Sequence, residues 1–313
     1  MSGVMQKNCH GKGRVRVVKL VRGENGVHDV MQLSVQILLE GDSMAEVYET
    51  GDNAKVVATD TCKNTVYCVA HQNEFSSPEE FGVLLVKHFL SNYSDIYNRV
   101  SVQVIKDRWE RLVAPDSSGR MGPHLHTFKR IGPNRPYAHV QGEKRAGSEL
   151  KLAVQSGFRG LEIMKTTQTG FEGFHRDKYT SLPETDDRIL GTSIGAEWTY
   201  PPCLVLQGTI DYNTVAEKLE DAFVNTFAGP ADKGVYSKSV QQTLLQMANA
   251  ALAVAPAVSS ITLDMPNIHN IAFPTEKHGM ANKDHTGRPF IFFPIDEPHG
   301  MITATVVRKN SRL

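Results

Sequence analysis

Alternating and helical patterns of hydrophobic residues divide the chain into strands and helices. Residues 14–22, RVRVVKLVR, alternate basic and aliphatic side chains with a period of two, which is typical of a half-buried strand. After a turn at Gly23–Gly26, residues 27–39 form a second and longer run, VHDVMQLSVQILL. Together the two runs predict an antiparallel hairpin.

Two helical segments follow the hairpin. The aliphatic run Val56–Ala58 leads into Thr59 and Asp60, which suit a helix N-cap, so a helix is predicted for residues 61–71. Backbone amides point outward at such a helix start, which favours an anion there. Ser76–Pro78 opens a second helix with proline in its first turn, and large apolar residues follow it at helical spacing.

The second half of the chain repeats this order of elements. Strands at residues 100–105 and 124–130 follow the two helices of the first half. The later strand-like runs are residues 150–167, 189–200, 261–265, 290–293 and 301–307, and the later helices are residues 212–227 and 240–254. This order fits two tandem units, residues 1–145 and 146–313, of an α+β protein with mainly antiparallel sheet. Exposed sheet edges need covering, and pairing between subunits would close a barrel, so we expect an oligomer.

Composition narrows the classes of function. The 34 Lys and Arg residues balance 34 Asp and Glu residues, which gives no electrostatic case for binding nucleic acid or an anionic membrane. No apolar run approaches the ~20 residues of a membrane span, and the first residues lack the apolar region of a secretory signal. The cysteines form no CxxC pair, which indicates free thiols in a reducing compartment; they are Cys9, Cys62, Cys68 and Cys203.

The last three residues resemble a targeting signal. Ser311-Arg312-Leu313 closely matches the Ser-Lys-Leu address that the peroxisomal import receptor reads, because arginine keeps the central positive charge. We therefore expect a peroxisomal protein.

The chemistry of the chain is concentrated at residues 169–190, TGFEGFHRDKYTSLPETDDRIL. Aromatic rings alternate here with charged side chains, and a strand is predicted to begin at the end of the run. An aromatic ring beside a guanidinium suits a planar, anionic heterocycle, because the ring stacks on the ligand and the arginine fork binds its edge. Taken alone, the stretch is also compatible with a solvated surface loop.

A set of short motifs in this order resembles the urate oxidase (uricase) family. The motifs are Gly11-Lys12, Val57-Ala58-Thr59-Asp60, Lys63-Asn64-Thr65, Gly157 to Lys165, Phe171, Gly173-Phe174, Arg176-Asp177, Tyr179-Thr180, Asp187-Arg188-Ile189-Leu190, Ser239-Val240-Gln241, Pro266-Asn267 and His269. The resemblance implies two repeats of the tunnelling fold (T-fold) per subunit, barrels built from several subunits, and a homotetramer. It also implies that O2 oxidises urate to 5-hydroxyisourate and is released as hydrogen peroxide, with no metal or organic cofactor.

The resemblance assigns substrate-binding roles to residues of both units. Phe171 stacks on the purine, Arg188 and Gln241 clamp its two ends, and the Val240 amide adds a hydrogen bond. The other implied contacts come from the Thr59 backbone and hydroxyl, from the Asp60 amide, and from Asn267 above the ring. The resemblance also implies that oxygen or water binds between Asn267 and Thr59. It further implies that two groups of residues meet across a subunit boundary. The group of the first unit is Lys12, Thr59 and Asp60, and that of the second unit is Phe171, Arg188, Gln241, Asn267 and His269.

The same resemblance implies a proton relay of Lys12, Thr59 and His269. Urate is electron-rich, so as a dianion it can itself donate electrons to O2, and the protein then supplies orientation and proton handling. A lysine acts as a base only when burial or a nearby cation lowers its pKa. A threonine hydroxyl both donates and accepts, so Thr59 can pass a proton.

Several residues depart from the family pattern without removing a ligand. They are Glu172, His175, Pro183, Asp186, Ile268 and Asn270.

Two other functions are compatible with the sequence. His124 and His126 would face one way on a strand, with His139 near in sequence, as in a metal-dependent oxidase, although no carboxylate or cysteine completes a usual ligand set. A non-catalytic purine-binding T-fold protein would keep Phe171, Arg188 and Gln241 but lack the relay.

Overall fold

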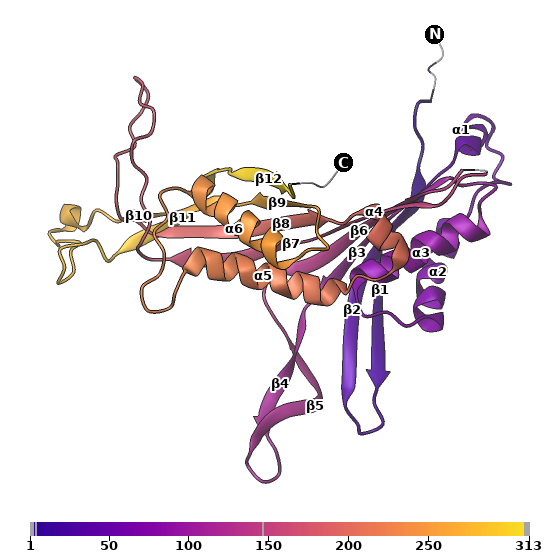
Figure 1. The fold of residues 1–313 in the computed structure, drawn as a ribbon, viewed down its shortest axis with the longest axis horizontal. Coiled ribbons are helices and arrows are strands. Elements are labelled where there is room, and N and C mark those ends of the chain that lie inside the picture. Colours follow the sequence, from indigo (N-terminus) through magenta and orange to yellow (C-terminus); the bar gives the residue numbers. More distant parts are fainter. Residues whose placement is uncertain (1–2, 4, 146, 310–313) are drawn as a thin grey trace. The chain divides into compact units, whose positions relative to one another are not determined.

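The structure is a computed structural model that describes residues 3, 5–145 and 147–309 (Figure 1). Packing separates two compact units: unit 1 consists of residues 1–158 and 198–214, and unit 2 consists of residues 159–197 and 215–313. The predicted tandem division after residue 145 describes a repeat of element order rather than these compact units, and it stays a prediction. Among the described residues, no helix is long and apolar enough to cross a membrane.

The strands in unit 1 follow the order β1, β2, β3, β6 and β7, and the pairs from β1 to β6 are antiparallel. Their bounds are β1 His10–Arg22, β2 His28–Glu40, β3 Arg99–Asp107, β6 Arg135–Glu143 and β7 Lys151–Lys165. Val15 pairs with Val35, and Val35 pairs with Val104, so buried valines of three strands share one face. The predicted hairpin of the first two strands is confirmed.

Two helices cover the buried face of this sheet. They are α2 (Thr59–Gln72) and α3 (Pro78–Asn92), and shorter helical segments are η1 (Asp42–Met44), α1 (Ala45–Thr50) and α4 (Pro202–Gln207). The start of α3 is as predicted, because the Ser77 side chain accepts from the Glu80 amide at 3.1 Å and Pro78 is the first helical residue. Gly82 allows α3 to lie close to the sheet, since a Cβ there would overlap Val140.

A separate hairpin of β4 (Trp109–Pro115) and β5 (Met121–Arg130) forms its own two-stranded sheet in unit 1 (Figure 1). The periodicity predicted only part of this region. The strand expected at residues 124–130 begins earlier, at Met121, and β4 and β6 were not predicted.

Unit 2 contains the end of β7 followed by β8, β10 and β11, with β9 paired to β8 and β12. The strand bounds are β8 Leu190–Thr199, β9 Ser260–Asp264, β10 Asn267–Ala272, β11 Phe292–Gly300 and β12 Thr303–Val307. The helices are α5 (Tyr212–Ala228), α6 (Val240–Val254) and the short η2 (Thr275–His278). Helix α6 packs against β9 and β12, and its residues Leu244 and Met247 are buried. The bounds predicted for α6 are confirmed, whereas β10 was not predicted.

A buried carboxyl group lies in the core of unit 1. The side chain of Glu79, in the first turn of α3, accepts a hydrogen bond from Ser156 Oγ at 2.5 Å. Tyr200 OH lies 3.1 Å from Ser156 Oγ and accepts from Trp198 Nε1 at 2.7 Å. Burial raises the pKa of Glu79 above its ordinary 4.5, although the bond from Ser156 acts in the opposite direction.

The raised pKa of Glu79 predicts a pH-dependent loss of stability. Between the unfolded pKa and the higher folded pKa, the folded state binds more protons, so stability falls as pH rises through this window. Glu79→Gln removes this titration and keeps the shape of the side chain. The thermal unfolding midpoint of the variant minus that of the parent protein should therefore increase as pH rises from 5 to 8. A difference between the two midpoints that is constant over this range would contradict the prediction.

Candidate functional site

The segment of residues 169–190 folds back on itself in unit 2. The Phe171 amide donates to the Thr185 carbonyl at 2.7 Å, and the Thr185 amide donates back to Phe171 at 3.2 Å. The Arg188 amide donates to the Thr169 carbonyl at 2.9 Å. As a result the Arg188 guanidinium carbon lies 5.6 Å from the centre of the Phe171 ring. The ring and cation inferred from the sequence are neighbours in the structure.

A second ring extends this pair. Phe174 lies flat against Phe171, with ring centres 4.9 Å apart and an angle of 9° between the planes. The Arg176 guanidinium lies 5.2 Å from the centre of the Phe174 ring. A planar ligand that stacks on Phe171 therefore uses its other face or displaces Phe174.

Arg188 keeps hydrogen-bonding capacity that the described residues do not use. Its Nε is buried and has no hydrogen-bond partner among them. Burial lowers the pKa of this guanidinium, although arginine remains charged at neutral pH. A buried guanidinium with an unpaired N–H is costly unless an acceptor arrives, so the geometry suits an anionic ligand.

The start of helix α6 is tied to the same segment. The Ser237 amide donates to the Gln168 carbonyl at 2.8 Å, and the Gly170 amide donates to the Ser237 carbonyl at 3.0 Å. Two residues later, the Ser239 side chain caps α6 by accepting from the Gln242 amide at 3.1 Å. The amides of Val240 and Gln241 are the first in the helix, where no intrahelical acceptor exists, so they are available to a ligand.

Asn267 and His269 lie on β10 of the same unit. Asn267 is 8% exposed and pairs with Thr192 on β8 and with Gly300 on β11. The pKa of half-buried His269 is lowered by burial and then by the positive charges of Arg188 and His299. The lowered pKa favours the neutral form of His269, which is the form that accepts a proton.

The predicted residues of unit 1 lie near one another at the start of β1 and of α2. Thr59 is the first residue of α2 and Asp60 the second, whereas the N-cap is Ala58, which makes no side-chain cap bond. The expected capping role of Thr59 and Asp60 is therefore wrong. The reason is that the Asp60 carboxylate instead bonds Lys63 and Asn64, which together hold its pKa below the ordinary value; the charge of Lys12 adds a smaller effect.

A buried tyrosine joins these two chain segments. Tyr97, which is 1% exposed, accepts from the Val57 amide at 3.0 Å and lies 3.1 Å from Nε2 of His10. His10 Nε2 also lies 3.1 Å from the Val57 carbonyl. These contacts anchor the residues two positions before Lys12 and two before Thr59. Sequence reasoning missed them, because no local pattern shows which tyrosine a distant histidine meets.

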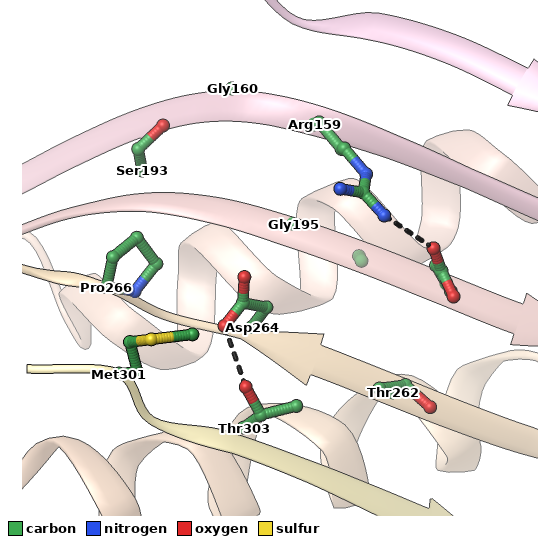
Figure 2. A pocket seen from close by; sticks show the side chains of 11 residues that line it. Arg159, Gly160, Ser193, Gly195, Thr262, Asp264, Pro266, Met301 and Thr303 are labelled. Carbon is green, nitrogen blue, oxygen red and sulfur yellow. Dashed lines mark hydrogen bonds and ion pairs between the residues drawn. The ribbon is translucent and has the colours of Figure 1, made fainter.

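A cavity of about 410 Å³ lies elsewhere in unit 2, on strands β7, β8, β9 and β12 (Figure 2). Arg159 forms an ion pair with Glu197 at 3.1 Å in this cavity, and the Asp264 carboxylate accepts a hydrogen bond from Thr303 Oγ1 at 2.7 Å. Phe171 and Arg188 are absent from its lining. The cavity is thus not the ligand site that the sequence predicted.

Comparison with known proteins identifies the family. The family model for uricase matches residues 8–141 and 154–303. The chain belongs to the uricase family. Uricases from Dictyostelium discoideum and Arabidopsis thaliana are each 40% identical to it; the alignments cover 98% and 99% of this chain and 98% of each relative.

Solved uricase structures share the fold. The crystal structure of uricase from Arthrobacter globiformis superimposes with a TM-score of 0.85 at 32% identity, and the match covers 100% of this chain and 98% of that one. The predicted α+β class with the tunnelling fold is confirmed. All predicted catalytic and substrate-binding residues lie within the ranges that match the uricase family.

The positions expected to depart from the uricase pattern lie mainly at the surface. Glu172, His175, Pro183 and Asp186 are exposed, whereas Ile268 and Asn270 are half-buried. The Asp186 carbonyl accepts from Tyr236 OH at 3.0 Å. None of these side chains replaces Phe171 or Arg188.

The histidines of the alternative metal site do not form one in the described part of the chain. The rings of His124 and His126 touch on β5, with centres 4.7 Å apart, but His139 lies on β6 and its Nε2 is 2.6 Å from Ser101 Oγ. No group of three or more His, Cys, Asp or Glu residues among those described has a metal-binding arrangement. Cys9, Cys62, Cys68 and Cys203 are free, as expected.

The close packing at Gly170 generates a prediction. A Cβ at this position would overlap the Tyr236 hydroxyl and crowd the Thr185 carbonyl. Gly170→Ala should therefore destabilise the protein by about 1–3 kcal/mol and speed hydrogen exchange at the amides of Phe171 and Arg188. Gly122→Ala on β5 is the matched control, because its new methyl group would meet open space. Equal exchange in the two variants would show that the packing is not restrictive.

Proposed function

We propose that this protein is a urate oxidase. Urate, O2 and water would give 5-hydroxyisourate and hydrogen peroxide, so urate loses two electrons and O2 gains them. The observation that carries the proposal is the contact between the Phe171 ring and the half-buried Arg188 guanidinium, whose buried Nε has no hydrogen-bond partner among the described residues, in a chain of the uricase family. The relatives compared above are all named uricases.

Unit 2 would bind the substrate. Phe171 stacks on the purine, and Arg188 and Gln241 hold its two ends by hydrogen bonds. The Val240 amide, free at the start of α6, adds a further donor to the anionic edge. Losing one such buried polar contact costs about 1–3 kcal/mol of binding free energy, because its partner stays unpaired. Asn267, buried on β10, lies in the proposal above the ring, where it orients oxygen or water.

Unit 1 would supply the proton relay. Lys12 and the Thr59 hydroxyl accept and pass protons from the substrate, and neutral His269 of unit 2 completes the path. The Thr59 and Asp60 amides, at the free start of α2, contact the other edge of the purine. No metal or organic cofactor is needed in this scheme, because the urate dianion is itself the reductant.

The proposed site needs an oligomer. Lys12, Thr59 and Asp60 belong to unit 1, while Phe171 and Arg188 belong to unit 2. We propose that a homotetramer brings the first group of one subunit to the second group of its neighbour. Strand β1 begins the strand order and β11 ends it, from β1, β2, β3, β6 and β7 through β8 and β10 to β11. Each of these two strands therefore has an edge that can pair with another subunit.

Peroxisomal import also belongs to the proposal. Ser311, Arg312 and Leu313 lie outside the described residues, and the signal acts only at a carboxyl terminus. A peroxisome is a suitable compartment for an enzyme that releases hydrogen peroxide.

A direct assay tests the reaction. Protein freed of metals with a chelator, mixed with urate in air, should consume urate and release hydrogen peroxide in equal amounts. Elemental analysis of the same sample distinguishes the metal-dependent alternative, which requires stoichiometric metal for activity. Urate that binds but is not consumed would identify a non-catalytic purine-binding protein.

The relay and the shared site can be tested together. Lys12→Met and Thr59→Ala should each lower kcat at least about tenfold, as loss of acid–base help does, whereas Phe171→Ala should weaken urate binding more than it alters assembly.

Co-expressing Lys12→Met with Phe171→Ala should restore part of the activity, because some mixed sites contain only intact residues. Unchanged kcat in the relay variants would refute the relay, and absent restoration would refute the shared site.

A further inference from the structure

Lys165 has an unusual environment for a lysine. It is the last residue of β7 and is half-buried. Its ammonium group donates to Ser237 Oγ at 2.6 Å, to the Val235 carbonyl at 3.0 Å and to the Phe227 carbonyl at 3.3 Å. It also lies 5.0 Å from the centre of the Phe227 ring. All three N–H groups of the ammonium are therefore accounted for.

Neutral groups alone satisfy this cation. Among the described residues, no carboxylate forms an ion pair with Lys165. Burial accordingly lowers the pKa of its ammonium. A methionine would fill a similar volume without this desolvation cost. The ammonium must therefore contribute something that packing alone does not.

Ser237 is the residue through which Lys165 reaches the candidate site. Ser237 is 2% exposed, and its hydroxyl oxygen accepts from both Lys165 and Thr243 Oγ1, the latter at 2.8 Å. Thr243 lies in the first turns of α6. The backbone of Ser237 bonds Gln168 and Gly170 on the other side. Ser237 thus links three parts of unit 2: its hydroxyl joins β7 to the helix that carries Val240 and Gln241, and its backbone joins both to the segment that carries Phe171.

We propose that Lys165 is a positioning residue for substrate binding. Its ammonium ties the end of α5 and the loop at Val235–Ser237 to the end of β7. This fixes the separation between the ring of Phe171 and the first amides of α6. The inference rests on the proposed urate oxidase function and adds to it a residue that does not touch the substrate. A purine that cannot contact both the ring and these amides at once leaves a hydrogen-bonding group of the site unpaired, which weakens its binding.

The test compares two changes at Lys165 with a change at an exposed lysine. Lys165→Met removes the donors and keeps the length of the side chain, whereas Lys165→Arg keeps the charge and the donors. Lys151→Met is the control, because Lys151 lies at the exposed start of the same strand. KM and kcat for urate are measured, together with the inhibition constant of xanthine, a related planar purine.

Lys165→Met should raise both KM and the xanthine inhibition constant about tenfold or more, with a smaller change in kcat. Lys165→Arg should recover most of this loss, and Lys151→Met should behave as the parent protein does. A lysine that only stabilises the fold would instead lower the amount of active enzyme and leave KM unchanged. Unchanged KM and xanthine binding in Lys165→Met would overturn the proposal.

A double-mutant cycle with Ser237→Ala tests the route of the effect. If Lys165 acts through Ser237, the two changes together should raise KM by clearly less than the product of their separate effects. Effects that multiply would overturn this route. If Lys165→Met does not fold, Ser237→Ala alone decides, because it removes one contact of the ammonium: a raised KM supports the proposal and an unchanged KM refutes it. Failure of the parent protein to oxidise urate would instead refute the proposed function.

Discussion

The hydrogen bonds between Ser237 and the backbone at residues 168–170 are the constraint on which the candidate site of unit 2 depends. This short β-bridge fixes the positions of three features: Phe171, Arg188 and the start of α6. Gly170 leads directly into Phe171, the Thr169 carbonyl holds the Arg188 amide, and Ser237 leads into the cap of α6. Buried backbone groups must be paired, so this arrangement has few alternatives. A ligand that binds here loses little free energy to ordering of the protein.

Two half-buried cations near this bridge have opposite roles, and their hydrogen bonds show why. Lys165 gives its donors to protein oxygens and so has none left for a ligand. Arg188 keeps a buried Nε without a partner among the described residues, so its capacity is open. The charge of Arg188 also lowers the pKa of His269. An anion bound to Arg188 would offset that field and raise the pKa of His269, which favours proton uptake at the moment when an acidic substrate loses a proton.

Local patterns predicted those elements whose signals are local. The hairpin of β1 and β2 follows from period-two alternation, and α3 begins at the Ser77–Pro78 signal. The strand β10 was missed because its six residues, Asn267–Ala272, do not alternate clearly between apolar and polar. The cap expected at Thr59 failed because Asp60 has closer partners in Lys63 and Asn64.

The candidate site shows the same limit. Phe171 and Arg188 were recognisable because they lie in one unusual segment, and the remaining site residues followed from family motifs. Lys165 and Tyr97 were not assigned a role, because their partners are 72 and 40 residues away, at Ser237 and Val57. A lysine that bonds neutral oxygens leaves no complementary charge in the sequence to reveal it. Contacts of this kind become visible only when the chain is folded.

Each unit thus fixes its own share of the proposed site. In unit 1, Tyr97 and His10 hold the segments that lead to Lys12 and Thr59, and in unit 2, Ser237 holds Phe171 and the start of α6. Under the proposed assembly, the only remaining freedom is the placement of one half relative to the other across the subunit boundary. Proton transfer requires hydrogen-bond distances between the halves, so contacts far from the purine that set this placement would control the rate as strongly as the relay residues do.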